Sequence, residues 1–369
     1  MRIGIDARLI GETGVGRYIR NLIAQLSAVD SKNDYVVFLT DASFHAFVLP
    51  NPRWKKVHAN IHWHTMAEQI GMPRLLQKEK LDLVHIPYHN PPVLYGGRMV
   101  VTIHDLTILH FSTGKATTLP LPLYQLKRLG YWLELYMGLR KAAHIIAVSE
   151  TTKREIIDHF HVPAKKITVT YEGVDAEMKK IPIGTKPLIR GPYFLYVGNA
   201  YPHKNVETLV RAFAKYRSDF TGDKSPKLVL VGGDDFFYRR LKDAVRVMGC
   251  TDDVIFYGAA KDSELVNLYT YARALVSPSF MEGFGLPALE ALSLGCPVLA
   301  SDIPIFHEIL GESATYFSPS DVTGLAELLV KVQSPSGDKT LADIARVGLY
   351  SWRRMAKETQ AIYEGSTRL

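Results

Sequence analysis

Residues 277–297 read SPSFMEGFGLPALEALSLGCP, and this stretch decides the fold class. We interpret it as the end of a strand, a loop rich in glycine, and a helix with a defined start and stop. Pro287 suits the first turn of a helix, where its missing amide hydrogen costs nothing, and Gly295 followed by Pro297 is a strong stop signal. A strand that runs through a short loop into a helix is the repeating unit of parallel α/β sheets.

The same alternation of short β-branched runs with helical patterns extends through both halves of the chain, which predicts an α/β fold. In the first half, the predicted strands are Arg2–Asp6, Tyr35–Leu39, Leu83–Ile86, Met99–Ile103 and Ala143–Val148. In the second half, they are Tyr193–Val197, Lys227–Val231, Val254–Tyr257, Ala274–Ser277, Val298–Ala300 and Ala314–Phe317. Apolar residues at spacings of three and four predict a helix after Gly16. A second helix is expected to begin at Asn205, whose side chain can accept hydrogen bonds from the free backbone amides of the first turn.

The chain length of 369 residues is that of two domains. Residues 171–192 contain Gly, Pro and Lys without periodicity, so we interpret them as the connection between the two. We therefore predict two Rossmann-like parallel-sheet domains, at 1–172 and 192–350. A linker at 173–191 would join them, and an amphipathic helix is expected within 351–369.

Composition and charge exclude several classes of protein. The chain has 44 Lys and Arg against 37 Asp and Glu, a net charge of +7, and its 47% hydrophobic content is that of a globular protein and excludes disorder. Only Cys250 and Cys296 are present, which fits a reducing compartment. Asp6 and Arg8 interrupt any signal-peptide core, and no apolar run approaches the roughly 20 residues that span a bilayer. We expect a cytoplasmic protein whose membrane contact, if any, is peripheral.

The loop at 282–286 has the features of a ligand site. Amides at a helix start carry partial positive charge, so those of Gly283 to Leu286 can bind phosphate or sugar oxygens, and the glycines let a ligand approach the backbone. Glu282 precedes the helix and Glu290 lies within it. An isolated glutamate is usually solvated or capping, but these two flank exposed amides at the carboxyl end of a parallel strand, where open α/β sheets bind ligands.

The sequence EGFGLP at 282–287, with a second Glu eight residues after the first, resembles the signature of the family 4 retaining glycosyltransferases of GT-B fold. Further motifs follow in the family's order along nearly the whole chain: Asp6-Ala-Arg8, Gly14-Val-Gly16-Arg17-Tyr18, Thr102-Ile-His104-Asp105-Leu106, Val148-Ser149-Glu150, Gly173-Val-Asp175, Val197-Gly198 through Lys204-Asn205, and Ser351-Trp352. The Thr102–Leu106 form is most similar to the branch that uses GDP-mannose. The resemblance implies an acceptor-binding amino-terminal domain and a nucleotide-sugar-binding carboxyl-terminal domain that face each other across a cleft, with the last helix packing back on the first domain.

The resemblance also implies roles for individual residues. Glu282 would bind the donor sugar hydroxyls, the amides of Gly283, Phe284 and Gly285 would hold sugar and phosphate oxygens, and Glu290 would accept from the ribose. Lys204 would neutralise the departing diphosphate, which places positive charge where negative charge develops. His104 would face the donor sugar and the reaction centre, although a satisfied core histidine is nearly as plausible from the residues alone.

The remaining donor-binding residues implied by the family are Gly14, Gly16, Gly198, Asn199, His203, Gly232, Tyr257, Gly258 and Leu286. Gly14 and Gly16 would let the first loop approach the phosphates, and Gly232 would border the nucleotide. Tyr257 and Gly258 would lie beneath the base. Asn199 and His203 stand near positions where many family members carry an arginine, so the phosphate clamp here is expected to be one cation weaker unless protonated His203 contributes.

A metal site is not predicted. Six histidines crowd the first half, namely His58, His62, His64, His85, His89 and His110. Pro87 breaks the segment between His85 and His89, no cysteine lies among the histidines, and their spacing matches no helix-borne zinc pattern. The resemblance implies that no bound cofactor or divalent ion is required, so the nucleotide sugar enters as substrate alone.

We expect retention by same-face transfer. Double displacement needs two carboxyl groups about 5–5.5 Å apart, whereas eight helical residues would separate Glu282 and Glu290 by about 12 Å. The expected activity is that of a hexosyltransferase moving mannose from GDP-mannose to a glycan or lipid-linked acceptor in cell-surface polysaccharide or lipopolysaccharide synthesis. The alternatives are a UDP-sugar-dependent enzyme of the same family, or a non-catalytic GT-B subunit that binds nucleotide sugars.

The segment Ser112 to Lys141 mixes aromatic and basic side chains and carries a net charge of +4. This pattern is typical of a helix that contacts an anionic membrane surface, here the inner face of the plasma membrane. A core helix with solvated Lys and Arg on its outer face explains the pattern equally well. Nucleic acid is not an expected partner, because no aromatic-interleaved recognition motif is present.

Overall fold

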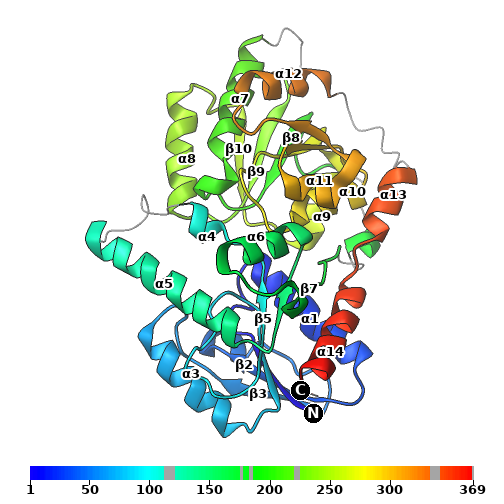
Figure 1. Cartoon of the computed structure of the whole chain (residues 1–369). Helices are drawn as coiled ribbons and strands as arrows, with labels where there is room; N and C mark the ends of the chain where they lie inside the picture. Colours follow the sequence, from blue (N-terminus) through cyan, green and yellow to red (C-terminus); the bar gives the residue numbers. More distant parts are fainter. Residues whose placement is uncertain (112–120, 175–177, 183–185, 220–224, 333–340, 368–369) are drawn as a thin grey trace. The chain divides into compact units, whose positions relative to one another are not determined.

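The computed structural model describes residues 1–111, 121–174, 178–182, 186–219, 225–332 and 341–367 (Figure 1). Two compact units are distinguished, and each is described by itself. Unit 1 comprises Met1–Leu109, Thr117–Gly173 and Ser351–Leu369, and unit 2 comprises His110–Ala116 and Val174–Tyr350, in each case within the described ranges. Parts of the linker expected at 173–191 and of the basic segment at 112–141, including Lys115, lie outside the described residues.

Unit 1 is built on a parallel seven-stranded sheet in the order β3-β2-β1-β4-β5-β6-β7. Its strands are β1 (Arg2–Asp6), β2 (Asp34–Leu39), β3 (Trp54–His58), β4 (Leu83–Ile86), β5 (Met99–Ile103), β6 (His144–Ala147) and β7 (Ile167–Val169). Every residue of β4 and β5 is buried, as expected for strands covered on both faces. The two edge strands β3 and β7 were not predicted from the sequence.

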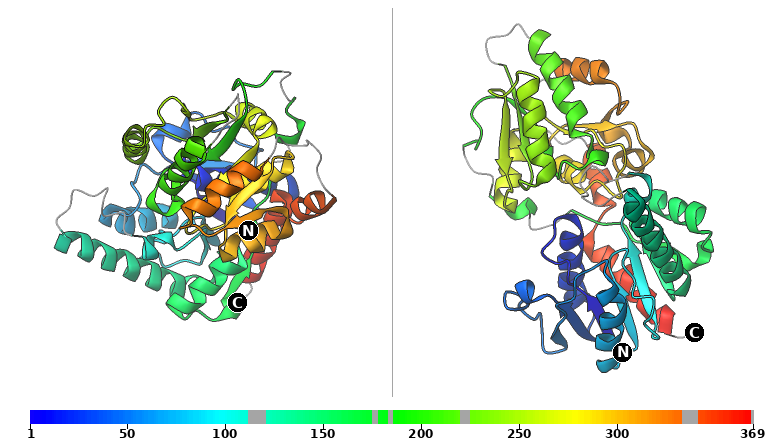
Figure 2. Two further views of the ribbon diagram at one scale, coloured as in Figure 1. Left: turned by 90° about the horizontal axis from the view of Figure 1, so that it is seen from above. Right: turned by 90° about the vertical axis from the view of Figure 1, so that its left-hand side faces the viewer.

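The helices of this first half are α1 (Gly14–Val29), α2 (Asp41–Phe44), α3 (Met66–Lys78), α4 (Thr107–His110), α5 (Leu121–Lys141) and α6 (Glu150–Phe160), and α14 (Trp352–Thr367) completes unit 1. The predicted apolar face of α1 is the face that is buried. Figures 1 and 2 show α14, in red, beside α1, in blue. A side chain at Gly173 would overlap with the backbone at Ser351 and Trp352, so the entry to α14 packs directly on the end of the first domain's chain.

Unit 2 is built on a parallel six-stranded sheet in the order β10-β9-β8-β11-β12-β13. Its strands are β8 (Tyr193–Val197), β9 (Lys227–Val231), β10 (Val254–Gly258), β11 (Ala274–Ser277), β12 (Val298–Ser301) and β13 (Thr315–Phe317). Its longer helices are α7 (Val206–Asp219), α8 (Phe236–Val247), α9 (Asp262–Tyr271), α10 (Leu286–Ser293), α11 (Pro304–Leu310), α12 (Val322–Lys331) and α13 (Leu341–Gly348). The predicted strands of this half are confirmed to within one residue at each end.

Alternate side chains of the unit 2 strands enter the core on one face. Phe194 and Tyr196 of β8 pack with the apolar residues of α7, α8 and α12. Tyr193 points the other way, and its hydroxyl donates to the Leu268 carbonyl of α9 at 2.7 Å. Helices therefore cover both faces of the sheet, as in doubly wound α/β folds.

The expected start of α7 is wrong in detail. Asn205 does not cap the helix with its side chain. It has a left-handed backbone (φ 55°), and its amide group donates to the carbonyls of Pro278 and Pro319 at 2.9 and 2.7 Å. The helix begins at Val206, and Asn205 instead ties the β8 loop to the loop that follows β11.

The direction of strand order reverses once in each sheet. In unit 1 the reversal lies between β1 and β4, and in unit 2 it lies between β8 and β11. The loops at the carboxyl ends of such neighbouring strands diverge to opposite faces of the sheet, which opens a crevice where α/β proteins bind ligands. Each unit therefore has one position at which a site is expected.

Candidate functional site

An ion pair lies at the reversal point of unit 2. The Lys204 ammonium follows β8 and donates to both carboxylate oxygens of Glu282, which follows β11, at 2.8 Å each. Ser279 donates its hydroxyl hydrogen to Glu282 Oε1 at 2.7 Å. About a fifth of the Lys204 side chain and 14% of the Glu282 side chain are exposed, so both groups reach solvent while their geometry is fixed.

The glycine loop leads from this pair into α10. Gly285 has φ 85°, and a side chain there would also press against Phe306, so both its conformation and its surroundings require glycine. The helix begins at Leu286 with Pro287 in its first turn, as predicted. The first amides of a helix have no intrahelical partner, so those after Glu282 provide donors beside its carboxylate.

Three predicted glycines lie together at the carboxyl ends of β8, β9 and β10. The Gly198 amide donates to the Val231 carbonyl at 2.9 Å, and the Gly232 amide donates to the Gly258 carbonyl at 3.0 Å. A side chain at Gly232 would overlap with the Gly198 carbonyl and the Tyr238 hydroxyl. Close backbone packing therefore leaves no room for a larger residue at Gly232.

Two of the predicted donor residues are largely enclosed. Glu290 is 3% exposed and accepts a hydrogen bond from the Tyr269 hydroxyl of α9 at 3.1 Å. The Phe284 ring is buried edge-on against Tyr350, with ring centroids 5.5 Å apart. The Phe284 side chain thus anchors the loop, and only its backbone can meet a ligand.

The other predicted residues of unit 2 surround the same end of the sheet. Asn199 accepts from the Tyr201 amide at 3.3 Å, and the His203 carbonyl accepts from the Phe280 amide at 2.8 Å. The Tyr257 hydroxyl donates to Glu264 at 2.8 Å, and burial followed by the nearby carboxylate raises the pKa of Tyr257 to about 12. These contacts hold the β8 and β10 loops in place.

Three predicted residues belong to unit 1. Gly14 opens α1 with free space where a side chain would stand, whereas a side chain at Gly16 would press on the Ile10 carbonyl. His104 follows β5, and its ring nitrogens lie 3.1 Å from a Glu172 carboxylate oxygen and 3.1 Å from the Pro87 carbonyl. Both neighbouring oxygens can accept a hydrogen bond from the imidazole ring.

The structure thus brings Lys204 and Glu282 together in unit 2, and it places His104, Gly14 and Gly16 in unit 1. Two residues of the site were not predicted from the sequence. Ser279 orients Glu282, and Glu172 orients His104. Ser279 could have been found, because it lies three residues before Glu282 in the same loop. Glu172 lies 68 residues from His104, and no local pattern joins them.

A second polar cluster lies at the reversal point of unit 1. Arg8, after β1, pairs with Asp6 at 2.6 Å and with Glu68 at 2.5 Å, and all three side chains are buried. Burial, followed by the charge of Lys127, lowers the pKa of His64 to about 4. Burial and the charge of Glu68 raise the pKa of Glu134 to about 7.

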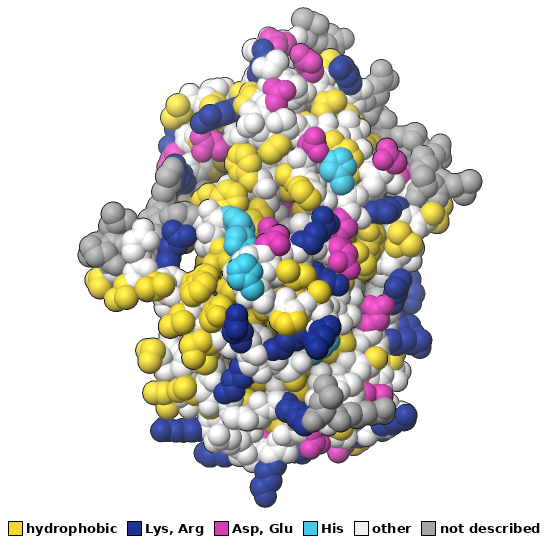
Figure 3. Space-filling view, in the orientation of Figure 1, with side chains coloured by type: hydrophobic (Ala, Val, Ile, Leu, Met, Phe, Trp, Pro, Cys, Tyr) yellow, Lys and Arg dark blue, Asp and Glu magenta, His cyan; other side chains and the backbone are white. Residues whose placement is uncertain are grey.

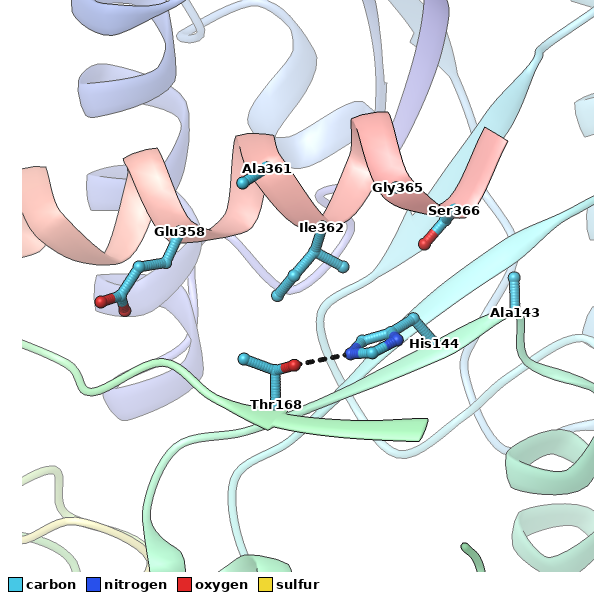
Figure 4. A pocket seen from close by; sticks show the side chains of 8 residues that line it. All are labelled: Ala143, His144, Thr168, Glu358, Ala361, Ile362, Gly365 and Ser366. Atoms are coloured by element: carbon cyan, nitrogen blue, oxygen red, sulfur yellow. Dashed lines mark hydrogen bonds between the residues drawn. The ribbon is translucent and has the colours of Figure 1, made fainter. Parts of the chain in front are cut away.

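An open hollow of unit 1 lies away from the reversal point of that unit (Figure 4). It is bounded by α14 and by the edge of the sheet, where His144 and Thr168 share a hydrogen bond of 2.8 Å. Ala143 and His144 lie at the amino end of β6, opposite to the end where the strands deliver ligand-binding loops. We assign no function to this hollow.

Comparison with known families divides the chain into two adjoining matches. Residues 13–178 match the family described as Glycosyltransferase Family 4. Residues 179–343 match the family described as Glycosyl transferases group 1. The two matches meet between Met178 and Lys179, inside the predicted linker.

Individual relatives agree with these matches. The O-antigen chain mannosyltransferase RfbU of Salmonella typhimurium is 31% identical over 259 residues, which are 70% of this chain and 67% of the relative. The O-antigen chain mannosyltransferase B of Escherichia coli is 27% identical over 382 residues, covering 95% of this chain and 96% of the relative.

Solved structures show the same fold. Sucrose-phosphate synthase from Thermosynechococcus elongatus superposes with a TM-score of 0.78 at 20% identity, over 99% of this chain and 98% of that chain. Anabaena HepE, in complex with UDP and glucose, superposes with a TM-score of 0.73 at 15% identity, over 99% of this chain and all of the other.

Proposed function

Because the chain belongs to glycosyltransferase family 4 and has the GT-B fold, we propose that it transfers mannose from GDP-mannose to a hydroxyl group of a glycan or lipid-linked saccharide. The process is the synthesis of a cell-surface polysaccharide or glycolipid. The names of the two relatives, both O-antigen chain mannosyltransferases, support this choice of sugar and pathway class. In this proposal unit 2 binds the donor and unit 1 binds the acceptor.

The Lys204–Glu282 pair is the observation that carries the proposal. A sugar hydroxyl would donate to the Glu282 carboxylate while the diphosphate accepts from Lys204, so the two side chains would act on either side of the sugar–phosphate bond. An ammonium has three donors, and two of them are directed at Glu282, which leaves the third for a phosphate oxygen. Positive charge beside the leaving group stabilises the charge that develops there, without a metal ion.

Retention by same-face transfer fits the separate surroundings of the two glutamates. Glu282 interacts with Lys204 and Ser279, whereas Glu290 is buried against Tyr269. A double displacement would instead need both carboxylates at the same bond. In the proposed route the diphosphate leaves, the acceptor hydroxyl attacks from the same side, and its proton passes to the departing phosphate oxygen.

Substitution Glu282→Gln tests the site. Loss of a charge-assisted hydrogen bond, about 1.5–3 kcal/mol, should slow transfer roughly 10- to 100-fold. The matched control is Glu207→Gln on α7, an exposed acid that pairs only at the surface with Arg211, and it should leave the rate unchanged. A folded Glu282→Gln variant with wild-type transfer kinetics would remove Glu282 from the mechanism.

The donor is identified by ligand-induced stabilisation of unit 2. A ligand at a hundredfold excess over its Kd stabilises by about 2.7 kcal/mol, so GDP-mannose should raise the melting temperature more than UDP- or ADP-sugars. Calorimetry is the suitable readout, because all four tryptophans, Trp54, Trp63, Trp132 and Trp352, belong to unit 1. A larger rise of the melting temperature with UDP-sugars would show that the donor is a UDP-sugar and not GDP-mannose. No rise with any nucleotide sugar would favour the non-catalytic subunit.

We also propose that α5 lies on an anionic membrane surface at the inner face of the plasma membrane. Its exposed apolar residues recur every three or four positions, at Leu123, Leu126, Leu129, Leu133 and Met137. Hydrophobic side chains gather over this helix in Figure 3. Basic residues of the same helix, Lys127, Arg140 and Lys141, are exposed and would favour anionic lipid by about 1 kcal/mol each. No helix in the described part of the chain is long and apolar enough to cross a bilayer.

A further inference from the structure

The polar cluster at the reversal point of unit 1 contains side-chain atoms that lack partners. His64 Nδ1, His89 Nδ1 and Tyr131 Oη are shielded from solvent, and none of them has a hydrogen-bond partner in the described residues. Their rings lie together, with centroids 5.4–5.5 Å apart in all three pairings. Buried polar atoms without partners are rare in proteins, and several in one place indicate that something else binds there.

Ligand atoms for a cation lie in the same cluster. One ring nitrogen of His64 and one carboxylate oxygen each of Glu68 and Glu134 lie within 4.8 Å of one another. His64 precedes α3, Glu68 is in the first turn of α3, and Glu134 is in α5. The three side chains thus converge from α3, from the loop that precedes it, and from α5.

We propose that His64, Glu68 and Glu134 bind a divalent transition-metal cation, for which Zn²⁺ is the ion that best fits the donor atoms. An imidazole nitrogen favours Zn²⁺ and its neighbours in the periodic table, whereas Mg²⁺ and Ca²⁺ prefer sites made of oxygen alone. Three protein ligands leave one position of a tetrahedral zinc site open. His89 and Tyr131, which carry the other two unpartnered atoms, have their rings 5.4 Å from the His64 ring.

Neighbouring groups orient the proposed ligands. Glu68 accepts hydrogen bonds from Arg8, from Asn90 and from the His64 amide at 2.5–2.6 Å. Glu134 accepts from Gln69 at 2.9 Å. Such outer hydrogen bonds fix the direction of metal-bound carboxylates and are a regular part of metal sites.

The charge of the cluster also suits a cation. Asp6, Glu68 and Glu134 together carry three negative charges when ionised. Arg8 carries one positive charge, so the net charge of these four side chains is −2. Lys127 acts on His64 from the exposed face of α5, where water screens its charge. A divalent ion would therefore neutralise a local excess and would join α3 to α5.

The proposed metal site is argued from unit 1 alone, whereas the proposed transfer is argued from the Lys204–Glu282 pair of unit 2 and uses no metal ion. The experiment uses the full-length chain after treatment with a chelator. Isothermal titration with ZnCl₂ should give one site per chain, and MgCl₂ and CaCl₂ should bind at least about 10-fold more weakly. Bound Co²⁺ should give the visible absorption of a nitrogen- and oxygen-coordinated ion.

Two variants test the ligands. Glu134→Gln keeps an acceptor for Gln69, and His64→Asn keeps a residue type that tolerates the left-handed backbone at this position (φ 57°). Each should weaken Zn²⁺ binding at least about 10-fold, by analogy with losses seen for outer-sphere partners. The matched control is His62→Asn, two residues upstream and exposed, which should bind as the wild type does.

Tryptophan fluorescence reports whether unit 1 of each variant is folded, since all four tryptophans belong to it. If a variant does not fold, the Co²⁺ spectrum and the stoichiometry of the wild-type chain still test the site. Absence of stoichiometric Zn²⁺ uptake by the wild type would overturn the proposal. So would equal binding by folded His64→Asn, Glu134→Gln and His62→Asn variants.

Discussion

At the residue scale, two adjacent glycines are expected to respond very differently to the same substitution. A side chain at Gly232 would overlap with the Gly198 carbonyl and the Tyr238 hydroxyl, whereas Gly233 has open space at that position. Gly232→Ala should destabilise unit 2 by about 1–3 kcal/mol through overpacking and weaken donor binding. Gly233→Ala should stay within about 0.5 kcal/mol of the wild type. Calorimetric unfolding measures both, and equal effects would show that the packing around Gly232 is not rigid.

Residues whose role depends on local pattern were predictable, and residues whose role depends on distant partners were not. The start of α10 follows from Gly285 and Pro287, which act within one turn. Asn205 fits the pattern of a helix cap, but its side chain is held by Pro319, 114 residues away. The sequence argument against a metal site used the histidine spacing, Pro87 and the absence of a nearby cysteine, and no local pattern shows that Glu68 and Glu134 lie close to His64.

At the scale of elements, the central strands and the two edge strands of unit 2, β10 and β13, were predictable, whereas the two edge strands of unit 1, β3 and β7, were not. β5 is buried at every position, so its apolar run alone identifies it. β3 lies at the edge of its sheet with the sequence WKKVH, and its two lysines mask the pattern while protecting the edge from further pairing. β7 has only three residues and directly follows Lys165 and Lys166, which belong to a short helical turn, so no apolar run separates it from its surroundings.

The apolar stripe of α5 makes a prediction about this helix as a unit. Leu126 and Leu129 are 64% and 61% exposed, so replacing both with Gln should leave folding unchanged. Burial of a leucine in an apolar phase contributes about 1.5–3 kcal/mol, so the double variant should bind anionic liposomes at least about 10-fold more weakly. Val247→Gln, which alters an 88% exposed residue of α8, is the control and should float with liposomes as the wild type does. Unchanged flotation of the α5 variant would exclude this helix as the membrane contact.

At the scale of the whole molecule, the last helix is tied to the first sheet across nearly the full length of the sequence. His85 of β4 shares a hydrogen bond of 2.6 Å with the Tyr363 hydroxyl of α14 and one of 2.7 Å with the Thr102 hydroxyl of β5. Tyr363 and His85 are both fully buried. The stability of unit 1 therefore depends on a contact between residues that are 278 positions apart in the sequence.

This buried histidine should make the stability of unit 1 depend on pH. Burial lowers the pKa of His85 to about 3, whereas an unfolded histidine has a pKa of about 6.5. Between these values the unfolded chain binds a proton that the folded chain does not, so the contribution is full above about pH 6.5 and is lost as the pH falls. The free energy of unfolding then changes by about 1.4 kcal/mol per pH unit for one proton.

We expect His85→Gln to flatten the pH dependence of the free energy of urea unfolding by up to that amount, with tryptophan fluorescence reporting unit 1 alone. His62→Gln, at an exposed position, should leave the slope as it is, and parallel slopes for wild type and His85→Gln would mean that His85 titrates in the folded chain as freely as in the unfolded one.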